Sequence, residues 1–288
     1  MGIERTSEAR RFFLDLNGLR LHCQDWGGEG RPIILLHATS FVGSVYRPIA
    51  LALRSIGHVY SYDQRGHGDS TRPGDGDYSW ARTVDDLQAF IIAMKLEGAR
   101  GWGHSAGATA IGSLAGMRSD LITRGVLVEP VVFDDQAQES EEARETLLYE
   151  RTLKRRRWFE SAEAMSNNFE KKPPYDTWRR DMLREYCEAG TRPAFGGGVE
   201  LKCTPEIEAE YYARSREHAG LPLILGSRSP LLVMFGDRSD SLGSLISARI
   251  SGQLKNGRVI TVEGSGHFMP MERPEEVAGI AIDFFSEK

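Results

Sequence analysis

A serine between two glycines places the tightest constraint on how this chain folds. The pentapeptide GHSAG, residues 103–107, follows an apolar run at 99–102 and opens a stretch of small residues, 106–116, with helical character. The pattern predicts a strand, a sharp turn and a helix, and we call residues 103–107 the elbow. Backbone atoms crowd around the serine of such a turn, so flanking residues without a Cβ are required. The turn is expected to expose the Ser105 hydroxyl at the end of a strand.

The composition is that of a soluble globular protein with a sizeable core. Of 288 residues, 40% are hydrophobic and 27% charged, and the formal net charge is −5. A chain with this charge has no global basic field, so nucleic acid would need a local patch. The best candidate is the basic run KRRR at 154–157, but it follows an acidic stretch at 139–145 in a segment with helical spacing. Opposite charges pair along such a solvated face, so no nucleic-acid partner is expected.

Cysteine usage and the N-terminal segment indicate a cytoplasmic protein. The chain has three cysteines, Cys23, Cys187 and Cys203. An odd number at wide spacings favours neither a disulfide framework nor a zinc site. Residues 1–11 are polar and charged, and no stretch approaches the ~18 apolar residues needed to span a bilayer. We expect no metal, no cofactor and no membrane association, and the sequence leaves the oligomeric state open.

The first half of the chain alternates between strand and helix patterns. Two strand-like runs, 11–16 and 19–26, flank Asn17-Gly18, a dipeptide that suits a two-residue hairpin turn. Strand patterns at 32–36, 58–62 and 125–133 then alternate with helical patterns at 46–56 and 83–96 and with the elbow. This alternation predicts an α/β fold with a mostly parallel central sheet and flanking helices.

The alternation stops for about a hundred residues and then resumes. Residues 134–228 are rich in Glu, Arg, Lys, Trp and Tyr with helix-like spacing, interrupted by proline and glycine. Strand patterns return at 230–235 and 258–262, with helical patterns at 242–254 and 274–285. We therefore expect one core domain, residues 1–133 and 230–288, and an inserted helical lid, residues 134–229.

The Ser105 hydroxyl needs an imidazole to take its proton and an acid to orient that imidazole. In this strand order the acid and then the histidine should follow the serine along the chain. Of the seven histidines, His267 has the most suitable context, because EGSGH at 263–267 follows a strand and precedes a helix. That placement puts the imidazole on a loop at the carboxyl edge of the sheet. His267 is therefore the expected base.

The acid is expected at the same edge of the sheet. The strand at 231–235 runs into GDRSD, residues 236–240, and we favour Asp240. Asp237 lies closer to the strand, but directly after Gly236 it is suited to holding the turn with its own side chain. Glu129 is the alternative acid, because it ends the strand that follows the elbow helix and is also placed to reach the histidine.

An oxyanion formed at Ser105 needs backbone donors. One normally comes from the residue after the nucleophile, here Ala106, and one from the loop after the third strand, here residues 37–39. His37 in that loop is interpreted as structural, bridging loops by hydrogen bonds.

Taken together, these segments resemble the α/β-hydrolase fold superfamily over essentially the whole chain. LLHATSF is similar to its oxyanion loop, YDQRGHGDS to its D-x-R-G-x-G-x-S segment, GHSAG to its elbow, FGDRSD to its acid loop and GSGHFMPMERPEEV to its histidine loop. The resemblance implies Ser105 as nucleophile, His267 as base, Asp240 as acid, and Thr39 and Ala106 as oxyanion donors.

Two positions depart from, or add to, that pattern. Ala38 stands where the family usually has glycine. Glu129 lies on the strand from which zearalenone-lactonase-like and dehalogenase-like relatives draw their acid. The serine of the elbow argues against haloalkane dehalogenase and epoxide hydrolase, which carry aspartate there.

The resemblance implies a cofactor-independent serine hydrolase of the esterase or lactonase type, acting on a small-molecule ester or lactone through an acyl-enzyme. Carbon–carbon bond hydrolysis and perhydrolase chemistry use the same triad and stay open, as does a receptor that binds a small molecule without turnover. Aromatic residues of the lid, such as Trp178 and Tyr175, suit either a substrate pocket or lid core. Its arginines suit either an anionic substrate or a solvated surface.

Overall fold

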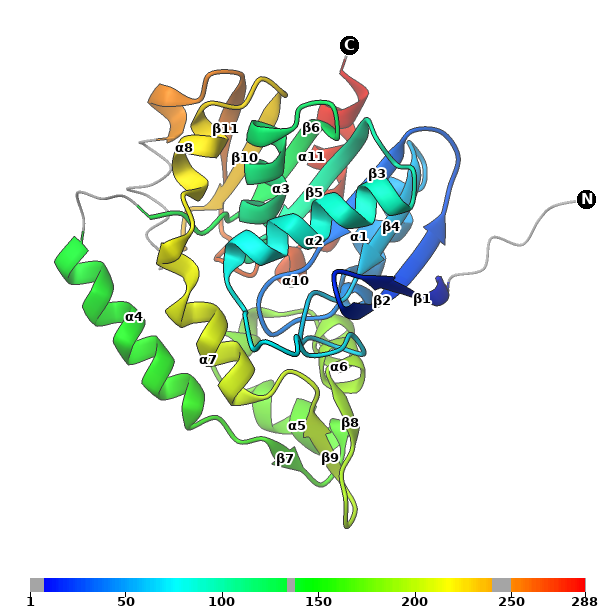
Figure 1. Ribbon diagram of the computed structural model, residues 1–288. Coiled ribbons are helices and arrows are strands. Elements are labelled where there is room, and N and C mark those ends of the chain that lie inside the picture. The colour runs from blue at the N-terminus through cyan, green and yellow to red at the C-terminus, as the bar shows by residue number, and fades with distance from the viewer. Residues whose placement is uncertain (1–7, 134–137, 240–249, 288) are drawn as a thin grey trace, which may run out of the picture.

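The computed structural model describes residues 8–133, 138–239 and 250–287. Within these ranges eight strands form one sheet in the order β1-β2-β4-β3-β5-β6-β10-β11 (Figure 1). β2 pairs antiparallel with β1 and β4, and every other pairing is parallel. The strands are β1 (Arg10–Leu16), β2 (Leu19–Gly27), β3 (Pro32–Leu36), β4 (His58–Tyr62), β5 (Ala99–His104), β6 (Ile122–Val128), β10 (Leu231–Gly236) and β11 (Gly257–Val262). The predicted α/β fold with a mostly parallel sheet is confirmed.

The opening hairpin forms as the Asn-Gly dipeptide predicts. Asn17 and Gly18 have φ angles of 52° and 75°, the left-handed values that a two-residue turn requires. The turn brings Leu16 opposite Leu19 and sets the register of β1 against β2.

Helices cover both faces of the sheet (Figure 1). The alternation of side chains along β3 supplies the two cores, because Ile33 and Leu35 pack with α1 and α11 while Ile34 and Leu36 pack with α2 and α3. The core helices are η1 (Gly43–Tyr46), α1 (Arg47–Leu53), α2 (Trp80–Ala93), α3 (Ala106–Met117), α10 (Met269–Glu272) and α11 (Pro274–Ser286). Of the helix predicted at 242–254, residues 242–249 lie outside the described part of the chain.

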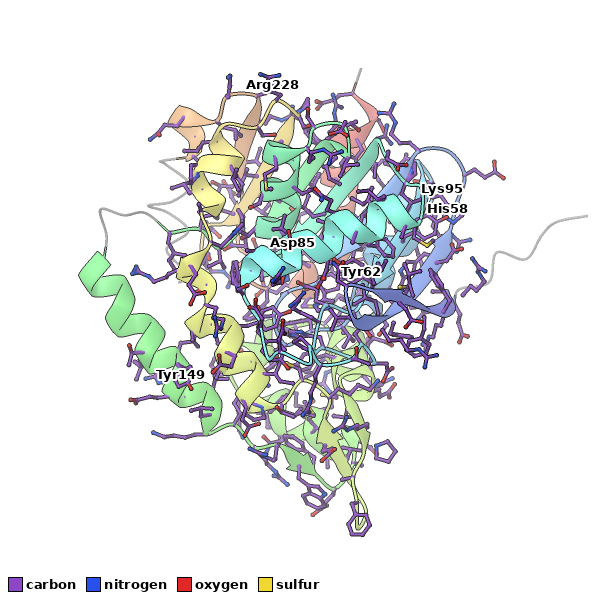
Figure 2. The ribbon with its side chains drawn as sticks, viewed as in Figure 1. His58, Tyr62, Asp85, Lys95, Tyr149 and Arg228 are labelled. Atoms are coloured by element: carbon purple, nitrogen blue, oxygen red, sulfur yellow. The ribbon has the colours of Figure 1, made fainter. Side chains whose placement is uncertain are left out.

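Helix α2 shows how the sequence pattern places a helix on the sheet. Asp85 lies on its outer side, whereas Tyr62 lies beneath it and packs its ring 4.9 Å from that of Phe90 (Figure 2). No helix in the described ranges is both long and apolar enough to cross a lipid bilayer.

The elements from α4 to η3, which follow β6 along the chain, lie at one end of the sheet (Figure 1). We call these elements the insertion. They are α4 (Gln138–Leu153), β7 (Trp158–Phe159), α5 (Ala162–Phe169), η2 (Tyr175–Thr177), α6 (Arg180–Ala189), β8 (Thr191–Pro193), β9 (Val199–Leu201), α7 (Pro205–Ala213) and η3 (Ser215–Glu217). The insertion is mostly helical, but β7, β9 and β8 form a small antiparallel sheet that the sequence pattern did not predict. Strands of two or three residues are too short to show alternation.

After the insertion, α8 (Gly220–Leu225) returns to the core and packs closely on α3. Small residues of α3 permit this approach, because a Cβ on Gly112 would meet Ile224 and one on Gly116 would lie 2.1 Å from the carbonyl oxygen of Leu223. His218 adds a hydrogen bond of 2.8 Å to the Ser113 hydroxyl. The chain after η3 is therefore packed on the helix that begins beside Ser105.

A buried carboxylate organises the glycine-rich loop after β4. Asp63 accepts hydrogen bonds from the His22 ring at 2.8 Å and from the backbone N–H groups of Gly43 at 2.8 Å and Asp69 at 3.1 Å. Burial opposes ionisation, but His22, the nearby His37 and the Gly43 N–H hold the pKa of Asp63 at about 2, below its ordinary 3.8. The charged carboxylate therefore ties β2 and η1 to this loop.

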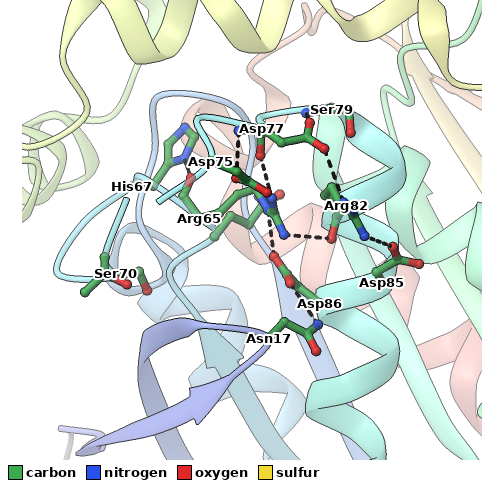
Figure 3. Close-up of polar contacts among 12 residues, drawn as sticks. Asn17, Arg65, His67, Ser70, Asp75, Asp77, Ser79, Arg82, Asp85 and Asp86 are labelled. Atoms are coloured by element: carbon green, nitrogen blue, oxygen red, sulfur yellow. Dashed lines mark hydrogen bonds and ion pairs between the residues drawn. The ribbon is translucent and has the colours of Figure 1, made fainter. Parts of the chain in front are cut away.

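A second buried charge in the same loop reaches α2. Arg65 donates from Nε to Asp86 at 2.8 Å and from Nη1 to the Asp77 carbonyl at 2.5 Å (Figure 3). Asn17 of the hairpin turn donates to the other Asp86 oxygen at 3.2 Å. Both side chains of the Arg65–Asp86 pair are at least 95% buried. The pair joins the loop, the hairpin and α2 near the end of the sheet that carries the elbow.

Candidate active site

The elbow has the geometry that its glycines predict. Ser105 lies between β5 and α3 with φ 53° and ψ −122°, and its N–H donates to the Val128 carbonyl at 2.9 Å. A Cβ on Gly103 would lie 2.5 Å from the Gly107 carbonyl oxygen, and a Cβ on Gly107 would lie 2.4 Å from that of Leu36. Neither contact is sterically possible without a shift of backbone, so the strained turn depends on both glycines.

The described residues place Glu129 against the predicted base. His267 Nδ1 lies 3.2 Å from Glu129 Oε2, which also accepts a hydrogen bond of 2.8 Å from the Ser239 hydroxyl. Glu129 Oε1 accepts 2.7 Å from the N–H of Gly236. Burial would raise the pKa of Glu129, but His267, Gly236 and Ser239 lower it, so the carboxylate is charged. A charged acceptor at Nδ1 holds the proton there and leaves Nε2 as the basic nitrogen.

Glu129 follows the end of β6, where the chain turns sharply. The strand predicted at 125–133 ends at Val128, because Glu129 has a φ of 50°. This turn directs its side chain toward the neighbouring end of β10, where Gly236 and Ser239 meet it.

Asp240, the acid favoured from the sequence, lies outside the described residues. Its neighbour Asp237 was expected to hold the turn that contains it, but Asp237 Oδ1 instead accepts a hydrogen bond of 3.2 Å from the Ser265 N–H in the histidine loop. Arg238 donates its backbone N–H to the Ser265 carbonyl at 3.0 Å. These contacts hold the acid loop and the histidine loop together.

The structure also shows a polar chain that the sequence analysis missed. Ala38 donates its N–H to the Tyr46 hydroxyl at 3.1 Å, and that hydroxyl lies 2.7 Å from His104 Nδ1. His104 Nε2 lies 2.8 Å from the His267 carbonyl oxygen, which can only accept, so Nε2 carries the proton and Nδ1 accepts from Tyr46. Burial lowers the pKa of His104 well below its ordinary value, so its ring is neutral. The chain links the predicted oxyanion loop to the histidine loop.

Two more buried histidines fix the loop that carries Thr39. The Gln64 N–H donates to His37 Nε2 at 2.8 Å, which leaves the proton on Nδ1 to bond the Ala38 carbonyl at 2.7 Å. His37 therefore bridges two loops, as its structural interpretation predicted. Ser40, with a φ of 70°, donates its N–H to His67 Nε2 at 2.9 Å. Burial lowers the pKa of His67 to about 3, which keeps this acceptor neutral.

Ser105 and His267 line one cavity of about 770 Å³, together with Thr39 of the oxyanion loop. Much of its wall is aromatic, and its aromatic members include Phe41, Tyr175, Trp178, Tyr186, Tyr212 and Phe268. Trp80 and Phe133 add to it from the core side. Both the insertion and the core therefore supply the wall. Ala106, the other predicted oxyanion donor, is buried beside Ser105 at the start of α3.

One arginine of the basic run at 154–157 turns inward. Lys154, Arg156 and Arg157 are exposed, as expected for a solvated face, whereas Arg155 is half-buried and lines the cavity. Arg155 pairs with the buried Glu208 and donates to the Ser40 hydroxyl at 3.0 Å. The helical spacing of the sequence could not distinguish Arg155 from its exposed neighbours, because its burial depends on contacts with α7 and the oxyanion loop.

Comparison with known proteins agrees with the fold. The chain belongs to the alpha/beta hydrolase family, whose model matches residues 33–280. It is 24% identical over 263 residues to a 2-(acetamidomethylene)succinate hydrolase from Mesorhizobium japonicum, an alignment that spans 91% of this chain and 90% of that protein. An N-formylmaleamate deformylase from Pseudomonas putida is 32% identical over 116 residues, which are 40% of this chain and 43% of that protein.

Solved structures show the same fold. The crystal structure of an E-2-(acetamidomethylene)succinate hydrolase matches with a TM-score of 0.86 at 21% identity, covering 97% of this chain and all of that one. At this identity the likeness concerns the fold alone.

Proposed function

We propose that the chain is a cofactor-independent serine hydrolase that cleaves a carboxylic ester or lactone through an acyl-enzyme on Ser105. The observation that carries the proposal is the contact between Glu129 Oε2 and Nδ1 of His267, a residue that lines the same cavity as Ser105. It orients an imidazole in a cavity that an elbow serine also lines, which is the combination of groups that acyl transfer requires.

The proposed reaction has two halves. Ser105 Oγ attacks the carbonyl carbon and gives its proton to His267 Nε2, and the N–H groups of Thr39 and Ala106 hold the oxyanion. His267 then protonates the leaving oxygen, the acyl-enzyme forms, and a water activated by the same nitrogen releases the acid. Every proton moves through His267, so these steps need only side chains, backbone N–H groups and water.

We assign the acid role to Glu129 and keep Asp240 as its competitor. Glu129 is buried and accepts hydrogen bonds from His267, Gly236 and Ser239, which suits a carboxylate that stabilises an imidazolium. The comparison with the Pseudomonas putida relative is compatible with acyl chemistry, because removal of a formyl group is itself an acyl transfer.

The test begins with a fluorophosphonate probe, which reacts with activated serines. The wild-type chain should be labelled at Ser105, and Ser105→Ala should not be labelled. Proton release at constant pH across short-chain esters, aromatic esters and lactones should then show turnover that Ser105→Ala loses by several orders of magnitude.

Other outcomes would change the assignment. Unimpaired turnover by Ser105→Ala would exclude the acyl-enzyme. Labelling without turnover of any ester or lactone would instead favour carbon–carbon bond hydrolysis, perhydrolase chemistry or a receptor.

A further inference from the structure

The wall of the Ser105 cavity contains a cationic group that the proposed reaction does not use. Arg155 follows α4, contacts residues of α6, α7 and the oxyanion loop, and lines the cavity. Nη1 contacts Glu208 and the Ser40 hydroxyl, and Nη2 donates to the Tyr186 hydroxyl at 3.3 Å. Burial opposes the charge on Arg155, but Glu208 together with Tyr186 and Tyr175 raises its pKa, so the guanidinium stays ionised.

Arg155 retains donors for a ligand. A guanidinium carries more N–H groups than the three acceptors among the described residues use. Its planar fork matches a carboxylate in a bidentate arrangement. Because Ser40 directly follows Thr39 in the chain, the Arg155 guanidinium lies close to the predicted oxyanion donor.

The charges around the cavity do not balance. Arg151, one helical turn before Arg155, lines the same cavity and forms no ion pair with a carboxylate of the described residues. Glu208 is the acid that opposes the two arginines on this side, and its Oε1 is engaged by the Tyr212 hydroxyl at 3.2 Å. Among the described side chains of this wall, positive charge is therefore in excess. An anion that enters the cavity gains from both guanidinium groups while its remaining surface packs on aromatic rings.

We propose that Arg155, assisted by Arg151, binds a carboxylate of the substrate, so the enzyme acts on acyl compounds that carry a second, anionic carboxyl group. This inference rests on the proposed function for the identity of the reacting bond. It does not depend on that function for the binding of the anion.

The kinetic test compares two substrates that differ in one charge. The 4-nitrophenyl monoester of adipic acid carries a carboxylate, and 4-nitrophenyl hexanoate is its neutral counterpart of the same chain length. Wild type should prefer the anionic ester in kcat/KM, and Arg155→Met should lower that preference about ten- to a hundredfold. Arg151→Met, a change at an exposed side chain, should lower it by a smaller factor. Lys154→Met, in the same basic run but outside the cavity, is the matched control and should leave the preference unchanged.

The ratio of kcat/KM for the anionic ester to that for the neutral ester distinguishes carboxylate binding by Arg155 from a purely structural role. If Arg155 only positions the Ser40 loop, Arg155→Met slows both esters equally and the preference stays as in wild type, which overturns the proposal. Removal of Arg155 alone leaves Glu208 buried without its partner, so Arg155→Met/Glu208→Gln, which removes both charges, guards against a folding defect.

A binding measurement decides the matter even without turnover. Adipate should raise the Tm of Ser105→Ala in a concentration-dependent manner, whereas dimethyl adipate should not, and the adipate effect should be lost in Ser105→Ala/Arg155→Met/Glu208→Gln. No effect of adipate, or an equal effect of the diester, overturns the inference. Fluorophosphonate labelling of wild type tests the proposed function separately, so a labelled protein with no anion preference would refute only the carboxylate subsite.

Discussion

His104 Nε2 donates a hydrogen bond of 2.8 Å to the backbone carbonyl of His267, so the residue before the elbow serine holds the loop of the expected base. The same ring accepts from Tyr46, which in turn accepts from the Ala38 N–H. Through two side chains, the oxyanion loop and the histidine loop are thus fixed relative to Ser105. A neutral imidazole suits this role, because it donates at one nitrogen and accepts at the other.

Tyr46→Phe should therefore disturb both loops. The change leaves the Ala38 N–H and His104 Nδ1 without their partner in a buried site, and should lower the free energy of unfolding by about 1–3 kcal/mol. It should also reduce kcat more than it raises KM. Tyr62→Phe is the control, because the buried Tyr62 hydroxyl has no hydrogen-bond partner among the described residues. Urea unfolding and ester kinetics on both variants check this, and equal losses from both would refute the role of the Tyr46 hydroxyl.

The two candidate acids can be separated by amide substitutions. Glu129→Gln removes the charge that keeps the His267 proton on Nδ1, and should lower kcat by about four orders of magnitude. Asp240→Asn should have a much smaller effect. Rates of fluorophosphonate labelling and of ester hydrolysis measure both variants. The reverse ranking would assign the acid role to Asp240.

Asp63 should make the protein acid-sensitive. In the folded protein its pKa is about 2, below the ordinary 3.8. The charged carboxylate therefore stabilises the fold fully at pH values above 3.8, and this stabilisation is lost as the pH falls toward 2. The difference corresponds to about 2 kcal/mol at neutral pH, of which about half is lost by pH 3.

The measurement compares wild type with Asp63→Asn in urea at pH 6 and at pH 3. The gap in unfolding free energy between the two proteins should shrink as pH falls. A gap that stays constant would mean that Asp63 has an ordinary pKa in the folded protein.

The buried pair in Figure 3 gives a stability prediction with a control one residue away. Asp86→Ala leaves the Arg65 guanidinium buried without its carboxylate and should cost about 3–5 kcal/mol. Asp85→Ala removes an exposed partner of Arg82 from the same helix and should change stability by at most about 1 kcal/mol. Thermal and urea unfolding measure both variants. Similar losses of unfolding free energy in Asp86→Ala and Asp85→Ala would contradict the prediction that burial makes the Arg65–Asp86 pair the more important one.

The sequence predicted best where local chemistry decides the structure. Asn17-Gly18 predicted a hairpin because those residues tolerate positive φ, and the elbow glycines predicted a strand–turn–helix because nothing larger fits. The sequence also predicted the ends of strands β4 and β11 to within one residue, because short apolar runs between turn signals mark buried strands.

The rest depends on contacts between distant segments. Glu129 follows β6 and the acid loop follows β10, and these strands are neighbours in the sheet, so both strand ends lie near the histidine loop. The sequence favoured Asp240, because the contact of Glu129 with His267 joins residues 138 positions apart and has no local pattern. Burial of Arg155 depends on Glu208, 53 residues away. The insertion's small sheet likewise forms from strands too short to have a signature, with residues 196–198 forming part of the turn between β8 and β9.

The close packing of α8 on α3 limits which part of the structure can move to make room for a bulky ligand. Leu223 and Ile224 of α8 lie against Gly112 and Gly116 of α3, the helix that begins directly after Ser105. Displacing α8 would strain the elbow. We therefore expect larger acyl groups to be accommodated by the insertion, and altered chain-length selectivity should be sought in variants there.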